Sequence, residues 1–235
     1  MGQQKAFIAA VGIICFAVIA WIAHGVTVGG SITGILVTSL LSLAGGPAMF
    51  GAVLLVFLLT YAATQIGRSR KTRLSIAEHH SGRDATQVLA NLGCAALTAA
   101  LAQLTPLRTA LLAGSIAVLA EAACDTVSSE AGKALAQNPR LITSWKSVPA
   151  GTDGAISLPG TLLGIVAAMI IGYEAAATNV LTAHSAVLVV VAGIAGMFLD
   201  SILGATLERP EWLSNNAVNL ISTAFSAVTA FVFVR

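Results

Sequence analysis

The chain has 235 residues, of which 57% are hydrophobic and only 9% are charged, and its formal net charge is +2. A soluble domain carries roughly 25% charged residues, so this composition excludes an ordinary soluble protein, whose water-facing surface it could not cover. Cys15, Cys94 and Cys124 lie far apart within apolar stretches, without a CxxC pair or a nearby histidine, which argues against a disulfide framework or a zinc site.

Apolar segments long enough to cross a bilayer recur along the chain. A spanning helix needs about 20 mostly apolar residues. The first segment, 6–26, is expected to be a retained anchor, because no small-residue cleavage site leads from it into a polar region. The second, 32–46, is short for a full crossing and is expected to be a short or re-entrant piece. The further expected crossings are 47–66, 86–104, 107–131, 155–176, 182–204 and 214–234.

These segments predict a single integral membrane domain over residues 1–235, an all-α polytopic bundle of about seven spanning helices plus one short or re-entrant segment. The loops 67–84, 133–153 and 205–213 fall on one side of it and contain most of the basic residues. Because cytoplasmic loops carry an excess of Lys and Arg, we expect these loops to be cytoplasmic. The expected localisation is an integral multi-pass protein, in the plasma membrane if the source is prokaryotic.

Several acidic residues lie within or at the ends of the predicted spans. An Asp or Glu at the bilayer centre costs about 2.5 to 3.5 kcal/mol, so these acids need compensation or a function. Helical spacing places Glu121 and Asp125 on one face of their segment, and Asp200 and Glu208 on one face of another. Glu130 lies about 140° round the helix from Asp125. It therefore joins the same site only from another face or through a distorted last turn, or it forms an ordinary ion pair with Lys133.

Amide and hydroxyl side chains accompany these acids. Asn91 follows Gln87 by one helical turn, and the last predicted span carries Asn215 and Asn219 at the same spacing. Carboxylates with amides and hydroxyls form an oxygen-rich site that suits Mg²⁺, and nearby Lys and Arg suit phosphate oxygens. Together they predict a metal–phosphate site at one membrane face. For the remaining stripe of Ser222, Ser226 and Thr229, helix–helix hydrogen bonding is the favoured interpretation.

Two further features give weaker signals. The loop 148–160 is turn-rich, and its glycines allow backbone N–H groups to approach a ligand. It leads into a helix N-terminus, which favours anions, but it lacks the spacing of a Walker loop. The pair His79–His80 is more readily interpreted as solvated than as a phosphate contact.

Five motifs in order carry a family resemblance: "SGRDATQVLANLG", "CDTVSSEAG", "GTDGAISLPGTLLG", "LDSILGATLE" and "NNAVNLIST". Together they resemble the integral membrane family typified by plant phytyl-phosphate kinase, from about residue 30 to the C-terminus. The resemblance implies a kinase that transfers a phosphoryl group from a nucleoside triphosphate, with CTP favoured, to phytyl, geranylgeranyl or another polyprenyl monophosphate. The product is the diphosphate.

The resemblance also assigns residues. The family's Asp-Thr-x-x-Ser-Glu corresponds to Asp125, Thr126, Ser129 and Glu130, and its Gly-Thr-Asn-Gly corresponds to 151–154. Three positions depart from the family pattern: Asp153 replaces an expected Asn, Glu208 an expected Gln, and Glu121 a small residue. These additional acids add negative charge to a phosphate site and leave the nucleotide less certain than the fold.

The resulting hypothesis gives each residue a role. Asp125, Glu130 and Asp200 hold Mg²⁺ that bridges the nucleotide phosphates. Arg83 and Lys133, helped by Lys71, neutralise the charge of the moving phosphoryl group. The further predicted substrate- and nucleotide-binding residues are Asn91, Ser129, Gly151, Thr152, Asp153, Gly154, Ser157, Ser201, Glu208, Asn215 and Asn219. Because the acceptor is already an anionic phosphate oxygen, positioning and charge neutralisation supply most of the catalysis, while the prenyl tail lies in a groove open to lipid.

Two alternatives from other classes stay open at this point. A transporter or flippase of a lipid phosphate would also carry intramembrane acids, but near mid-bilayer and reachable from both sides. A cytidylyltransferase that forms a CDP-lipid shares the metal and nucleotide requirements, and only its product differs. The expected environment is the lipid bilayer, no nucleic-acid partner is expected, and the sequence leaves open whether the chain forms a homo-oligomer.

Overall fold

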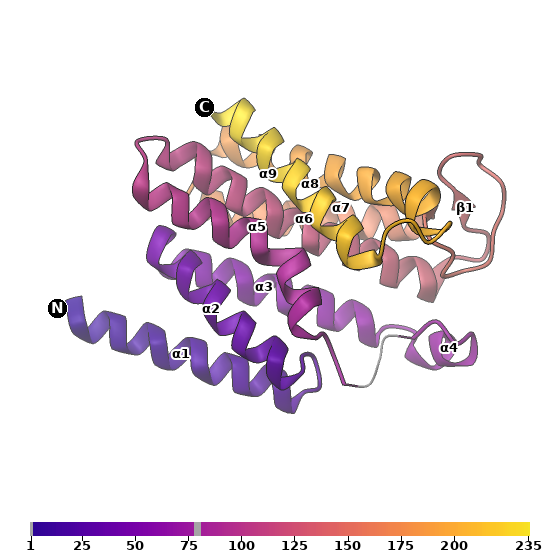
Figure 1. The fold of residues 1–235 in the computed structure, drawn as a ribbon, viewed down its shortest axis with the longest axis horizontal. Coiled ribbons are helices and arrows are strands. Elements are labelled where there is room, and N and C mark those ends of the chain that lie inside the picture. The colour runs from indigo at the N-terminus through magenta and orange to yellow at the C-terminus, as the bar shows by residue number, and fades with distance from the viewer. Residues whose placement is uncertain (1, 78–80) are drawn as a thin grey trace.

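The computed structural model describes residues 2–77 and 81–235; His79 and His80 lie outside the described residues. The chain forms an elongated helical bundle (Figure 1). Its elements are α1 (Gly2–Ile22), α2 (Val28–Gly45), α3 (Pro47–Gln65), α4 (Arg68–Arg73), α5 (Ala85–Leu104), α6 (Arg108–Leu135), β1 (Arg140–Leu141), β2 (Ala155–Ile156), α7 (Leu158–Ala177), α8 (Ala183–Leu203), the π-helix η1 (Gly204–Glu208) and α9 (Asn215–Val234).

The predicted all-α class is confirmed, with one correction to the predicted membrane spans. Among the described residues, seven helices are long and apolar enough to span a membrane, and they include α2. The expectation of a short or re-entrant piece over 32–46 is wrong, because α2 begins four residues earlier, where the Thr27 hydroxyl accepts a hydrogen bond from the Gly30 N–H. Gly29 and Gly30, which the predicted segment leaves out, belong to the first turn of α2. α1 itself runs over Gly2–Ile22, and its described apolar stretch is Phe7–Ile22.

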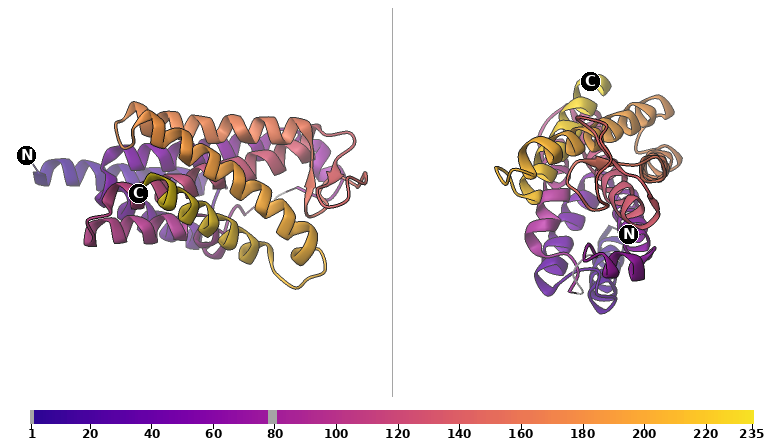
Figure 2. Two further views of the ribbon diagram at one scale, coloured as in Figure 1. Left: turned by 90° about the horizontal axis from the view of Figure 1, so that it is seen from above. Right: turned by 90° about the vertical axis from the view of Figure 1, so that its right-hand side faces the viewer.

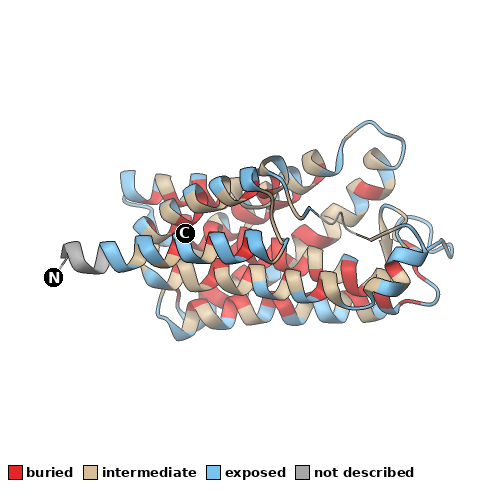
Figure 3. Ribbon diagram, turned by 90° about the horizontal axis from the view of Figure 1, so that it is seen from below, coloured by how far each residue is buried: buried red, intermediate tan, exposed pale blue. Residues whose placement is uncertain are grey.

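α6 is the central helix of the bundle. It packs against α3, α5, α7, α8 and α9, and most of its side chains are buried. Small residues such as Ala113, Gly114 and Ala120 let the neighbouring backbones approach closely. The surrounding helices alternate buried and exposed residues along their length (Figure 3). Many of the exposed residues are large and apolar, such as Leu43, Tyr173 and Val228. A bundle with an apolar exterior is what a lipid environment requires.

The loops gather at one end of the bundle, which we call the loop end. Both termini lie at the opposite end (Figure 1, Figure 2). The loop end contains α4, the β1–β2 hairpin, whose strands pair antiparallel, and the segment between η1 and α9. The predicted loops 67–84, 133–153 and 205–213 therefore meet, and the residues they contribute lie close together.

Local contacts fix these loops. The backbone of Arg83 pairs with the turn between α1 and α2, since its N–H donates to the Gly25 carbonyl and its carbonyl accepts from the Thr27 N–H. Asp84 then caps α5. Hydrogen bonds from the Gln87 N–H and the Thr86 hydroxyl lower the pKa of the Asp84 carboxyl. A lowered pKa means that the stabilisation from this cap is present above the ordinary Asp value and is lost only as the pH falls through the lowered one.

Candidate active site

Two polar cavities meet at the loop end. The first, here called the hairpin cavity, has a volume of about 160 Å³ and lies between the hairpin, α6, α8 and η1. The second, here called the Arg83 cavity, has a volume of about 120 Å³ and lies between α5, α6 and α9. Both are lined by Asp125, Ser129, Lys133 and Asn215, so they form one continuous polar site.

Nearly all predicted site residues come together here. The hairpin cavity is lined by Asp125, Ser129, Lys133, Gly151, Thr152, Asp153, Gly154, Ser157, Asp200, Ser201, Glu208 and Asn215. The Arg83 cavity adds Arg83, Asn91, Glu130 and Asn219. Of the residues predicted for the site, Lys71 alone lines neither of these two cavities, as far as the described chain shows.

The carboxylates of Asp125 and Asp200 differ in their hydrogen bonds. Asp200 lies in the last turn of α8, where its Oδ2 accepts a hydrogen bond from the buried Ser222 hydroxyl at 3.2 Å. Asp125 on α6 is partly buried, and no hydrogen-bond donor within residues 2–77 and 81–235 contacts its carboxylate. The two carboxylates interact electrostatically, as do Asp125 and the cations Lys133 and Arg83. Asp125 therefore keeps free acceptor capacity in a cavity that contains both signs of charge.

Glu121, one of the departures from the family pattern, lies one turn deeper on α6 and is fully buried. Gly193 and Gly196 of α8 make room for it, because a Cβ at Gly196 would meet the Glu121 side chain and the Ser226 hydroxyl. Ser226 itself donates to the Ala192 carbonyl at 3.1 Å, which joins α9 to α8 as the helix-bonding interpretation predicts. Glu121 interacts electrostatically with Asp125 and Asp200 but lines neither polar cavity.

Glu130 is held between two lysines. Its Oε1 lies 3.0 Å from Lys133 Nζ and its Oε2 lies 2.6 Å from Lys71 Nζ. The ordinary i, i+3 pair is therefore present, and α6 stays regular through this turn. Both carboxylate oxygens of Glu130 are engaged by these ion pairs, whereas Lys133 remains partly exposed and lines both cavities.

Lys71 lies behind the site rather than in it. It is fully buried, and its ammonium group donates to Glu130 and to the carbonyls of Ala63 and Thr64 at 3.2 and 2.7 Å. These contacts use all the protons of an ammonium group. The two carbonyls belong to the last turn of α3, so Lys71 caps that helix while it fixes Glu130. The neighbouring Arg70 caps α6 in the same way, through the carbonyls of Ala134 and Ala136.

Arg83 lies at the boundary between the polar site and the apolar interior of the bundle. Its guanidinium donates from Nη1 to the Thr60 hydroxyl at 2.9 Å, which ties the end of the 67–84 loop to α3. Asn91, on the next helix, lines the same cavity, and its amide nitrogen donates to the Gln87 carbonyl at 2.8 Å. Arg83 also lines the Arg83 cavity together with Asp125 and Lys133, where it can offer its other guanidinium donors to a ligand.

The hairpin and η1 close the other wall. Gly154 has φ +72°, and a Cβ there would meet the backbone and side chain of Ala205. The π-helical turn of η1 extends α8 and directs Glu208 toward the cavity. π-helical turns are frequent at functional sites. The hydropathy of the sequence did not predict the π-helical turn of η1. Pro139, Ala150, Gly132 and Gly204, which also line the cavity, carry no side-chain chemistry that the sequence could have revealed.

Gly154 offers a direct test of how the hairpin is docked. Gly154→Ala is expected to push the hairpin away from η1, because the new Cβ overlaps Ala205 and because φ is positive. Trypsin should then cleave at the exposed Arg140 and Lys146 several-fold faster. Gly46→Ala is the matched control: it has φ +76° and no neighbour within 4 Å, at the opposite end. Equal cleavage rates in both variants would contradict the proposed contact.

The donor set suits Mg²⁺ in the presence of a phosphate ligand. Among the described residues, no three His, Cys, Asp or Glu side chains are grouped closely enough to hold a metal ion by themselves. Mg²⁺ is usually bound by one or two carboxylates together with substrate phosphates and water. Asp125, with its unpaired carboxylate, and Asp200 in the same cavity fit that pattern, whereas Glu130 is already neutralised by two lysines.

Comparisons with known proteins agree with the motifs. A family model described as integral membrane protein DUF92 matches residues 11–227. Uncharacterized membrane protein sll0875 of Synechocystis sp. is 35% identical, over 76% of this chain and 70% of that protein. Protein VTE6, chloroplastic, of Arabidopsis thaliana is 31% identical, over 88% of this chain but 65% of that protein. Protein PGR of Arabidopsis thaliana is 31% identical, over 87% and 88%. No solved structure matches the chain.

Proposed function

Because the chain belongs to the integral membrane protein family DUF92, as its five motifs predict, we propose that it is a membrane-embedded kinase for prenyl monophosphates. The reaction class follows from the resemblance of these motifs to the family typified by plant phytyl-phosphate kinase. The observation that carries the proposal is the polar site itself, in which Asp125 and Asp200 share a cavity with Lys133 while Arg83 lies in the adjoining one. Such a combination suits a metal-bound triphosphate beside a second phosphate.

The two cavities suggest separate binding sites for the two substrates. The hairpin cavity reaches the surface at the exposed Ser129, Gly151 and Asp153, so a water-soluble nucleoside triphosphate, with CTP favoured, can enter there. The Arg83 cavity lies between helices and takes the monophosphate of the acceptor. Asp125 and Lys133 line both cavities, and the phosphoryl group crosses between them at this point.

The chemistry needs little from the protein beyond positioning and charge. An oxygen of the prenyl monophosphate forms a bond to the γ-phosphorus, and the bond from that phosphorus to the β–γ bridging oxygen breaks, which leaves the nucleoside diphosphate. Lys133 and Arg83 neutralise the phosphate charges, and Asn91, Asn215 and Asn219 donate hydrogen bonds. Asp125 and Asp200 would hold Mg²⁺, which would supply further neutralisation of the nucleotide phosphate charge. Glu130 and Lys71 position Lys133.

The loop end is proposed to be cytoplasmic. Most of the basic residues lie there, while Arg108 and Arg235 lie at the opposite end. The exposed side chains of Trp145 and Trp212 also lie at the loop end, and tryptophan is enriched at membrane–water interfaces. These features support a site at the depth where a lipid phosphate meets water.

The test is direct phosphoryl transfer. The purified protein, supplied with Mg²⁺, γ-labelled CTP or ATP and phytyl or geranylgeranyl monophosphate, is expected to form a labelled prenyl diphosphate. With α-labelled CTP the label should stay in the soluble CDP. Label in the lipid from α-labelled CTP would favour a cytidylyltransferase instead. No labelled lipid with any nucleotide would overturn the kinase proposal, and uptake into liposomes would then test the transporter alternative.

A further inference from the structure

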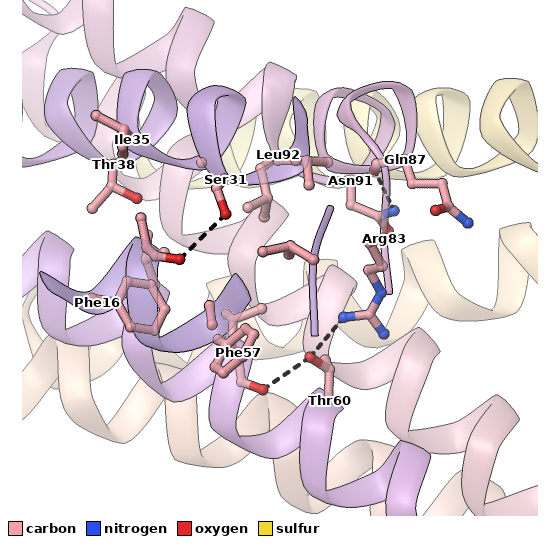
Figure 4. A pocket seen from close by; sticks show the side chains of 18 of the residues that line it. Phe16, Ser31, Ile35, Thr38, Phe57, Thr60, Arg83, Gln87, Asn91 and Leu92 are labelled. Atoms are coloured by element: carbon pink, nitrogen blue, oxygen red, sulfur yellow. Dashed lines mark hydrogen bonds between the residues drawn. The ribbon is translucent and has the colours of Figure 1, made fainter. Parts of the chain in front are cut away.

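A third cavity, almost entirely apolar, lies next to the polar site. It has a volume of about 90 Å³ and is lined by α1, α2, α3, α5 and α6. We call it the apolar cavity. Figure 4 shows that its walls change character along its length: Phe16 and Ile35 lie at one end, and Arg83 and Asn91 lie at the other.

The apolar cavity and the Arg83 cavity share their boundary. Arg83, Gln87, Asn91 and Thr126 line both of them. A ligand that fills both would need an anionic head at the guanidinium and a hydrocarbon chain beyond it. A nucleotide does not meet this description, because its base and ribose are polar, whereas a prenyl monophosphate does.

We infer that the apolar cavity binds the phosphate-proximal part of the acceptor's prenyl tail, with the phosphate on Arg83. The inference rests on the proposed kinase function and adds the place where the tail enters the bundle. The tail runs from Arg83 along α2, between α1 and α5, and its distal part continues into the surrounding lipid.

Small residues create the space for the tail. Ala17 and Ala20 of α1 and Gly30 and Gly34 of α2 line the cavity. From Gly30 to Thr38, which lines its far end, α2 rises about 12 Å, so more than the first isoprene unit is enclosed. Gly34 lies about one helical turn deeper than Gly30, and a Cβ built there would meet no atom within 4 Å. A side chain added at Gly34 therefore starts from open space at the wall of the cavity.

Two aromatic rings form the opposite wall. Phe16 of α1 packs edge-on against Phe57 of α3, with ring centroids 5.2 Å apart. Phe57 in turn lies beside Thr60, whose hydroxyl accepts the hydrogen bond from Arg83. The ring that contacts the tail and the residue that holds the phosphate-binding arginine thus lie on the same turn of α3.

Filling the cavity should shorten the acceptor that the enzyme can use. Gly34→Leu is expected to raise KM for geranylgeranyl phosphate by about tenfold or more, while KM for dimethylallyl phosphate changes little because that tail ends before Gly34. The matched control is Gly93→Leu on α5, which also has no neighbour within 4 Å but lines none of the three cavities. Equal KM changes for both acceptors, or equal changes in both variants, would overturn the inference.

A photolabelling experiment separates failure of this inference from failure of the proposed function. A prenyl monophosphate with a photoreactive group near its head is irradiated with the protein in detergent without nucleotide, and the labelled peptides are identified. Labelling of α1, α2 or α3 that geranylgeranyl phosphate competes away supports the inference, even if no turnover is found. Turnover with labelling only of other helices would leave the kinase in place and refute the tail site. Competition by a phospholipid but not by a prenyl monophosphate would assign the cavity to a membrane lipid instead.

Discussion

Replacing Asp125 or Asp200 with asparagine is expected to lower kcat for phosphoryl transfer by about 10²–10³-fold or more. Each change keeps the shape of the side chain and removes a negative charge from the hairpin cavity. Asp125 has the larger expected effect, because it lines both polar cavities and its carboxylate has no hydrogen-bond donor in the described part of the chain. Each variant should also need a higher Mg²⁺ concentration to reach half of its maximal rate.

Asp84→Asn is the matched control for these variants. It makes the same chemical change at the loop end, but Asp84 is exposed and outside the cavities, and asparagine caps a helix nearly as well. Its rate and Mg²⁺ dependence should match those of the unchanged protein. Thermal unfolding of all three variants in detergent shows whether they remain folded. Folded Asp125→Asn and Asp200→Asn variants with full activity would remove both carboxylates from the mechanism.

The spans and the clustering of the site were accessible from the sequence because both depend on local patterns. The length of an apolar run decides whether a helix can cross a bilayer, and six of the seven long apolar helices within residues 2–77 and 81–235 coincide with predicted crossings. The ordered motifs around Asp125, Asp200 and Asn215 identified residues that line common cavities. The second segment was predicted to be too short for a full crossing because its expected start at residue 32 omits the first turn of α2, where Gly30 leaves room for the Arg83 carbonyl.

The features of the site that depend on contacts between distant segments of the chain could not be predicted from the sequence. Lys71 and Arg83 lie in the same basic loop, yet one is buried under α3 and the other faces the site. Which of them reaches phosphate depends on how α4 docks on the ends of α3 and α6, and no local pattern encodes that. The apolar cavity is another example, since its lining comes from five helices and each of its small residues, taken alone, indicates ordinary close packing.

The buried ion pair between Lys71 and Glu130 gives the largest expected effect on stability. Lys71→Met is expected to lower the free energy of unfolding by about 3–5 kcal/mol, as for other buried pairs that lose one partner. The lost contacts are the 2.6 Å ion pair and the hydrogen bonds to the last turn of α3. Thermal unfolding in detergent should show a melting temperature lower by about 10 °C or more. Lys146→Met, the same substitution at an exposed position of the hairpin, should change it little.

A double substitution distinguishes a structural pair from a catalytic lysine. Lys71→Met combined with Glu130→Leu removes both charges together, so it should destabilise the protein less than the sum of the two single changes. Lys133 then loses its partner but stays partly exposed, so it can be solvated. Because Lys71 acts only by positioning, the double variant should keep measurable phosphoryl transfer with a raised KM for the nucleotide. Additive losses of stability would contradict the pairing of Lys71 with Glu130. A folded Lys71→Met variant that has lost kcat with KM unchanged would place Lys71 in the chemistry itself.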